Sequence, residues 1–96
     1  MSRFLHITLW DNDAARITEI ERNLHQAMRN LSLRGQVDIM SEPPLLARMG
    51  MLNEVPVLEI GGLYWKREAG RVIGLKACES LLAHIGMPGG EDAPES

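Results

Sequence analysis

The chain has 96 residues, of which 45% are hydrophobic and 24% charged, and its formal net charge is -3. A chain of this length holds one small domain, and a net acidic composition is poorly suited to nucleic-acid phosphates or anionic lipid. Its longest apolar runs are far shorter than the roughly 20 residues of a membrane helix. We therefore expect neither a nucleic-acid partner nor a membrane span.

The first half of the chain predicts two strands joined by a long helix. FLHITLW, residues 4–10, combines aromatic and β-branched types over the length of a strand. The DND that follows offers side-chain oxygens to cap a helix beginning near Ala14. Apolar residues then recur at steps of three and four, as on one face of a helix: Ile17, Ile20, Leu24, Ala27, Met28 and Leu31. QVDIM, residues 36–40, is the expected second strand, with its valine and isoleucine facing the core.

The second half predicts a short helix, a hairpin and a last helix. SEPPLLARMG, residues 41–50, has prolines suited to a first helical turn and a glycine to end it. PVLEI at 56–60 and LYWK at 63–66 flank two glycines that favour a tight turn. Helical spacing returns over 75–85, and the polar segment 87–96 is expected to be a disordered acidic tail. Residues 1–86 therefore form the predicted domain, an α/β fold with a four-stranded mixed sheet and helices on both faces.

This element order, together with LLARMGMLNEVPVLEIGG, resembles the small thioredoxin-like and glutaredoxin-like proteins over roughly residues 4–85. The resemblance implies a sheet order of 2-1-3-4 with the fourth strand antiparallel, flanked by three helices. It also implies that the Val55–Pro56 bond is cis and lies in the loop that faces the substrate. We therefore interpret Pro56, at the start of the third strand, as the marker of this substrate-facing loop.

In these families a Cys-x-x-Cys pair begins the first helix, where the helix dipole lowers a thiol's pKa. Matching the apolar helix positions places the pair on Ala14 and Ile17, and no Cys or Ser occurs anywhere from residue 11 to 31. Thiol–disulfide exchange needs an attacking thiolate. We therefore expect no catalytic residue, which favours a protein that is not an enzyme without deciding the question.

Other side chains with chemical potential have simpler explanations. Cys78 falls on a helical apolar stripe, which favours a buried small hydrophobe over a nucleophile. Asp11 and Asp13 precede a helix, which favours caps over a carboxylate pair for acid–base or metal chemistry. The three histidines lack metal-ligand spacing, so no metal site is expected. A lone cysteine and the absence of an export pattern at the N-terminus favour a cytoplasmic location.

Three features leave alternatives open. Trp10 is either an exposed anchor for a partner or a side chain packed on the first helix. Lys66, Arg67 and Arg71 form either a solvated connection or a site for an acidic peptide or the carboxylate of glutathione. Three methionines bracket the short helix and either fill core gaps or form an adaptable binding surface: Met40, Met49 and Met51.

Our leading hypothesis is a redox-inactive thioredoxin-like module that holds an extended peptide or protein partner, because backbone groups beside the proline can pair with an extended chain. The expected binding residues are Trp10, Asp11, Asn12, Asp13, Ala14, Ile17, Val55, Pro56 and Arg71. No cofactor is required. The alternative is a glutathione-binding or single-thiol redox protein in which Cys78 or a partner supplies the sulfur. A third possibility is a self-associating protein such as a homodimer.

Overall fold

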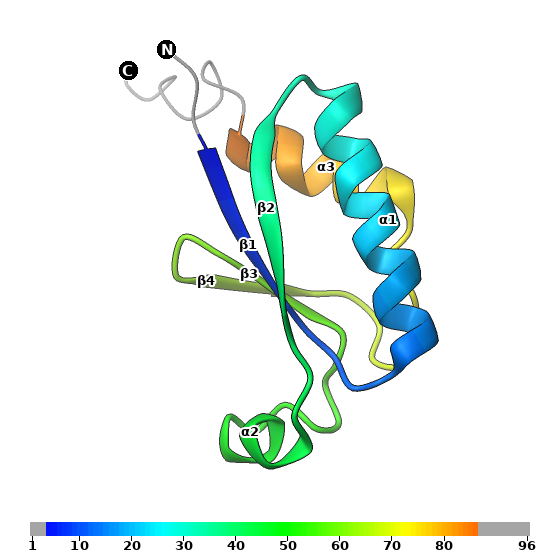
Figure 1. Ribbon diagram of the computed structural model, residues 1–96, viewed down its shortest axis with the longest axis vertical. Helices are drawn as coiled ribbons and strands as arrows, with labels where there is room; N and C mark the ends of the chain where they lie inside the picture. The colour runs from blue at the N-terminus through cyan, green and yellow to red at the C-terminus, as the bar shows by residue number, and fades with distance from the viewer. Residues whose placement is uncertain (1–3, 87–96) are drawn as a thin grey trace.

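The computed structural model describes residues 4–86, and the expected tail at 87–96 lies outside these residues (Figure 1). Seven elements follow one another along the chain: β1 (Phe4–Trp10), α1 (Ala14–Asn30), β2 (Arg34–Met40), α2 (Pro43–Arg48), β3 (Val57–Ile60), β4 (Leu63–Lys66) and α3 (Leu75–Gly86). No helix in this described part is long and apolar enough to cross a membrane.

The four strands form one mixed sheet in the order β2-β1-β3-β4. β1 runs parallel to β2 and antiparallel to β3, and β4 returns antiparallel to β3. The predicted α/β class, strand order and direction of the fourth strand are thus confirmed. The parallel pair requires a crossover connection, which α1 supplies, whereas β3 and β4 need only the Gly61-Gly62 turn.

The predicted boundaries differ from the observed ones at two strands. β2 begins at Arg34 rather than residue 36, because Gly35 lets the strand continue where a side chain would collide. A Cβ at Gly35 would lie 2.6 Å from the Leu5 carbonyl oxygen and 3.1 Å from the Met28 sulfur. β3 begins at Val57 rather than Pro56, since proline has no amide N–H to give to a ladder.

The main core lies between the sheet and the two long helices, α1 and α3, which pack against each other. Alternate residues of β1 point into it, as the period of a strand requires. Its buried members are Leu5, Ile7, Leu9, Ile20, Leu24, Ala27, Met28, Leu58, Ile60, Ile73, Cys78 and Leu82. Val37 and Ile39 of β2 pack against this cluster as predicted, although both are only half-buried.

A second, smaller cluster lies on the opposite side of the sheet, at the end where α2 lies (Figure 1). Trp10 belongs to it, while its neighbour Leu9 belongs to the main core, because successive strand residues point to opposite faces. The other buried members are Leu46, Met51, Val55 and Val57. Helices therefore cover both faces, as expected, but the short α2 covers only one end of the second face.

Candidate functional site

The first turn of α1 is the place where the sequence resemblance would put a thiol pair. Asp13 is the N-cap of this helix, and its Oδ1 accepts the backbone N–H of Arg16 at 2.9 Å. The predicted cap at Asp13 is therefore confirmed. Ala14 is exposed, while Ile17 is half-buried against the main core. Neither position carries a nucleophile, so this turn performs no thiol chemistry of its own.

Asp11 does not cap α1 but forms an ion pair with Arg16 in the first turn of this helix. The carboxylate is fully buried, and the Nε and Nη2 groups of Arg16 donate to its two oxygens at 2.7 Å each. The backbone N–H of Asn12 also donates to Oδ1, at 2.7 Å. This hydrogen bonding to Asp11 raises the pKa of the Arg16 guanidinium. The Asp11 carboxylate is consequently engaged on both oxygens and is not free for acid–base work.

Arg16 also reaches the connection between β4 and α3. Its Nη1 donates to the carbonyl oxygen of Gly70 at 3.1 Å, and the Gly70 N–H donates to the carbonyl oxygen of Val55 at 2.8 Å. A continuous polar chain therefore joins Asp11, Arg16, Gly70 and Val55, which we call the Arg16 network. Three loops that are far apart in sequence are held together by it.

The Val55–Pro56 peptide bond is cis, and both residues are buried. The Val55 N–H donates to the carbonyl of Met51 at 3.1 Å, while its own carbonyl accepts from Gly70. Both backbone groups of Val55 are thus engaged within the chain. The expected pairing of an extended peptide with these groups has no free donor at Val55.

Trp10 is not an exposed anchor, since only 6% of it is accessible. It packs in the cluster beside α2, and its indole Nε1 donates to Glu59 Oε1 at 3.2 Å. The alternative of packing on the first helix is also wrong, because Trp10 points to the other face of the sheet. Trp10 therefore does not present its side chain to a partner, and it contributes to the small buried cluster instead.

The basic residues after the hairpin pair with acids of the same chain. Lys66 forms an ion pair with Glu54, and the exposed Arg71 pairs with Glu68 at 3.3 Å. These partners fit a solvated connection better than a site reserved for an external carboxylate. Arg71 also lies beside Gly70, so it borders the Arg16 network without belonging to it.

Cys78 is fully buried on α3, as predicted, and its thiol faces the carbonyl oxygen of Ile73 at 3.8 Å. Burial, assisted by the negative charge of Glu79, raises the pKa of the Cys78 thiol to about 11. A thiol with this pKa is protonated at neutral pH and is a poor nucleophile. Within residues 4–86 no three His, Cys, Asp or Glu side chains lie close enough together to hold a metal ion.

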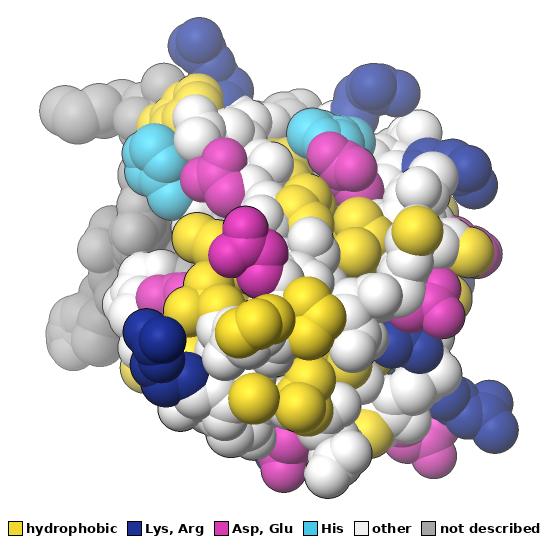
Figure 2. Space-filling view, turned by 60° about the horizontal axis from the view of Figure 1, so that its bottom comes forward, with side chains coloured by type: hydrophobic (Ala, Val, Ile, Leu, Met, Phe, Trp, Pro, Cys, Tyr) yellow, Lys and Arg dark blue, Asp and Glu magenta, His cyan; other side chains and the backbone are white. Residues whose placement is uncertain are grey.

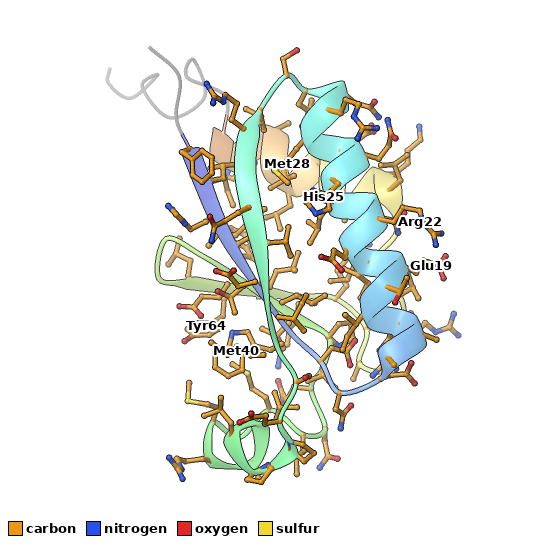
Figure 3. The ribbon with its side chains drawn as sticks, viewed as in Figure 1. Glu19, Arg22, His25, Met28, Met40 and Tyr64 are labelled. Atoms are coloured by element: carbon orange, nitrogen blue, oxygen red, sulfur yellow. The ribbon has the colours of Figure 1, made fainter. Side chains whose placement is uncertain are left out.

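Of the three methionines around α2, one fills the core and two are exposed. Met51 is buried in the small cluster, whereas Met40 and Met49 are 38% and 43% exposed. Leu52, which follows Met51, is 42% exposed. Figure 3 shows Met40 at the end of β2 nearest α2. Figure 2, which turns the α2 end forward, shows hydrophobic side chains gathered on this side of the molecule. We call Met40, Met49 and Leu52 the α2 face.

Sequence reasoning missed the importance of Arg16. A cation in the first turn of the helix, five residues after an aspartate that directly follows a strand, is the local signal that points to it. Its contact with Gly70 joins residues that are 54 positions apart in the sequence, so no local sequence pattern predicts it. Comparison of the chain with protein-family models, curated proteins and solved structures gives no match.

Proposed function

We propose that the protein is a redox-inactive, thioredoxin-like binding module that engages a protein partner through the α2 face. The observation that carries this proposal is the exposure of three large apolar side chains at one end of the molecule. Clusters of exposed apolar residues on a small domain are typical of interaction sites. The element order and the strand order 2-1-3-4 support the thioredoxin-like assignment.

The absence of thiol chemistry is supported from two directions. At the first turn of α1, the positions that match the thiol pair carry Ala14 and Ile17. Cys78 is buried and its pKa is raised to about 11, which argues against the single-thiol alternative. A protein without a usable thiolate binds its partner rather than exchanging disulfides with it. One cysteine in this sequence also supports a reducing compartment, and we propose the cytoplasm.

The proposed partner is a protein segment in extended form whose apolar side chains lie on the methionines. Methionine is unbranched and polarisable, so an exposed pair adapts to partners of different shape. Asn12 and Asp13 in the loop before α1 and Ala14 at its first position are also exposed, and we propose that they extend this surface. Binding relies on side chains, because the backbone groups of Val55 are already paired within the chain.

The test is affinity capture from native lysate with the wild type beside a Met49→Glu, Leu52→Glu double variant. Both residues are exposed, so the substitutions introduce charge without opening the core. Leu63→Glu is a suitable control, because Leu63 is also apolar and exposed but lies at the β3–β4 turn. We expect the double variant to lose partners that the control retains. Equal recovery by all three proteins would contradict the proposal.

A further inference from the structure

The outer edge of β2 is unpaired within residues 4–86, since β2 has β1 as its single neighbour in the sheet. The N–H of Asp11 donates to the Met40 carbonyl at 3.2 Å, so the backbone of Met40 faces β1. In a parallel pair the direction alternates along the strand. The backbone groups of Gly35, Val37 and Ile39 therefore point outward.

The sequence of this strand, RGQVDIM, carries two charges, Arg34 and Asp38, but lacks several other devices that protect an edge. It has no proline, no lysine and no bulge in its seven-residue register with β1. Proteins commonly use these devices to prevent an exposed edge from pairing with another chain. A seven-residue edge of this kind is thus a template for an added strand.

The exposed side chains of β2 are complementary to themselves. Arg34, Gln36, Asp38 and Met40 alternate on one face and are all exposed. The cation Arg34 is two residues before Gln36, and the anion Asp38 is two residues after it. A second strand that runs antiparallel, with the symmetry axis at Gln36, brings each Arg34 opposite an Asp38 of the other copy. This arrangement forms two cross-strand ion pairs from one contact, as an isologous interface does.

Other registers lack this match. An axis at Arg34 or at Asp38 would place like charges directly opposite each other, which is destabilising. An axis at Gly35 or Val37 would leave Arg34 without Asp38 as its opposite residue. The register at Gln36 also pairs the outward backbone groups of Gly35 with those of Val37 in the other copy. The backbone pattern and the charges therefore favour the same register.

The face of β2 toward α1 supports the same contact. Leu33, Val37 and Ile39 pack against the main core yet remain half-buried. In the register at Gln36, Ile39 of a second copy lies opposite Leu33. A hollow of about 340 Å³ beside Leu33 is bordered by Gly35 and Met28 and also by the polar side chains of His25, Arg29 and Arg34, and Figure 3 shows Met28 projecting from α1 toward β2. Contact between Ile39 of one copy and Leu33 of the other would remove part of these half-buried apolar side chains from water, which favours association.

We propose that the protein forms a symmetric dimer by antiparallel pairing of β2 with β2 of a second copy, centred on Gln36. The sheet then continues across both copies. This inference does not depend on the proposed function, because its cross-strand contacts are made by residues 33–39, and Met40 is the one residue of the α2 face that lies on the same strand.

Charge reversal tests the register by sedimentation equilibrium of the full chain. The wild type should approach twice the chain mass of 10.7 kDa as its concentration rises. Arg34→Asp or Asp38→Arg alone creates two like-charged pairs and should weaken dimerisation by at least about tenfold. The double exchange, Arg34→Asp with Asp38→Arg, restores both pairs and should return the dissociation constant to within about threefold of the wild type. Lys76→Asp, a charge reversal at an exposed position on α3, should have no effect.

Three results would overturn the proposal. They are a wild type that stays monomeric at several hundred micromolar, single reversals that leave dimerisation unchanged, or a double exchange that fails to restore it. Circular dichroism shows whether each variant is folded. If a variant is unfolded, hydrogen exchange of the wild type decides the question. The amides of Gly35, Val37 and Ile39 should become more protected as concentration increases, and exchange that is independent of concentration contradicts a dimer at this edge.

Discussion

Arg16 holds Asp11 in a bidentate ion pair, with its Nε and Nη2 each 2.7 Å from a carboxylate oxygen. Arg16 lies between Ala14 and Ile17, in the turn that carries the thiol pair in the families that the sequence resembles. The turn is therefore used here to hold loops together. Through Gly70, the same guanidinium group connects α1 to the loop that contains Val55 and Pro56.

Arg16→Ala should strongly destabilise the protein. The substitution leaves Asp11 buried without its cation, and such a loss typically costs about 3 kcal/mol or more. Urea unfolding monitored by circular dichroism measures the change. Arg22→Ala is the control, because Arg22 is exposed on the same helix and points away from the sheet (Figure 3). It should change the free energy of unfolding by less than about 0.5 kcal/mol. Equal effects of the two substitutions would contradict a structural role for the Arg16 network.

The stability should fall in alkaline solution because of Cys78. Its pKa is raised from 9.0 to about 11 in the folded protein, so the folded state holds the thiol proton more tightly than the unfolded state. The corresponding stabilisation is complete below pH 9 and is lost as the pH rises from about 9 to about 11, by up to about 3 kcal/mol. Urea unfolding at pH 8 and pH 10.5 measures this loss.

A Cys78→Ala variant separates this effect from the titration of other groups. It should be less stable than the wild type at pH 8, because it removes buried sulfur. Its stability should then decline less steeply above pH 9. Parallel declines in the two proteins would show that the Cys78 thiol is not the group responsible.

Gly35→Ala should be destabilising. The new methyl group would lie 2.6 Å from the Leu5 carbonyl oxygen, which belongs to the paired backbone of β1 and has little freedom to move. Overpacking of this kind costs about 1–3 kcal/mol. Gly74→Ala is a matched control, since no atom lies within 4 Å of its added methyl group. Thermal unfolding should show a lower midpoint for Gly35→Ala and not for Gly74→Ala. An unchanged midpoint for Gly35→Ala would refute the close approach of the Gly35 backbone to the Leu5 carbonyl.

The protein should not accelerate the reduction of insulin disulfides by dithiothreitol. Ala14 and Ile17 supply no sulfur, and the Cys78 thiol is both buried and protonated at neutral pH. Native protein should likewise leave Cys78 unmodified by a thiol reagent until denaturant is added. Insulin turnover above the buffer rate would refute the redox-inactive assignment, and rapid native modification would revive the single-thiol alternative.

The elements were predictable from the sequence because their signals are local. The helical spacing from Ile17 to Leu31 and the two glycines between β3 and β4 each act within a few residues. The positions of Trp10 and Arg16 were not predictable in the same way. Trp10 lies beside α2 because α2 packs on the face of the sheet opposite the main core, and Arg16 meets Gly70 across most of the chain. Both depend on tertiary arrangement, which no short window of sequence contains.

The same reason explains why the proposed binding surface differs from the predicted one. Val55 and Pro56 stand in the predicted loop, but the N–H of Gly70 occupies the Val55 carbonyl. Asn12, Asp13, Ala14 and Arg71 of the predicted surface are exposed. The exposed apolar side chains that follow α2 are Met49 and Leu52, which a sequence pattern does not separate from the buried Met51. The surface available to a partner is thus decided by which side chains the fold leaves uncovered.

Hydrogen exchange of the protein with and without its captured partner tests the proposed binding surface most directly. We expect the partner to protect amides in and after α2, over residues 45–54, and to leave α3 and the β3–β4 turn unchanged. Protection confined to α3 or to the β3–β4 turn, with residues 45–54 unaffected, would contradict it.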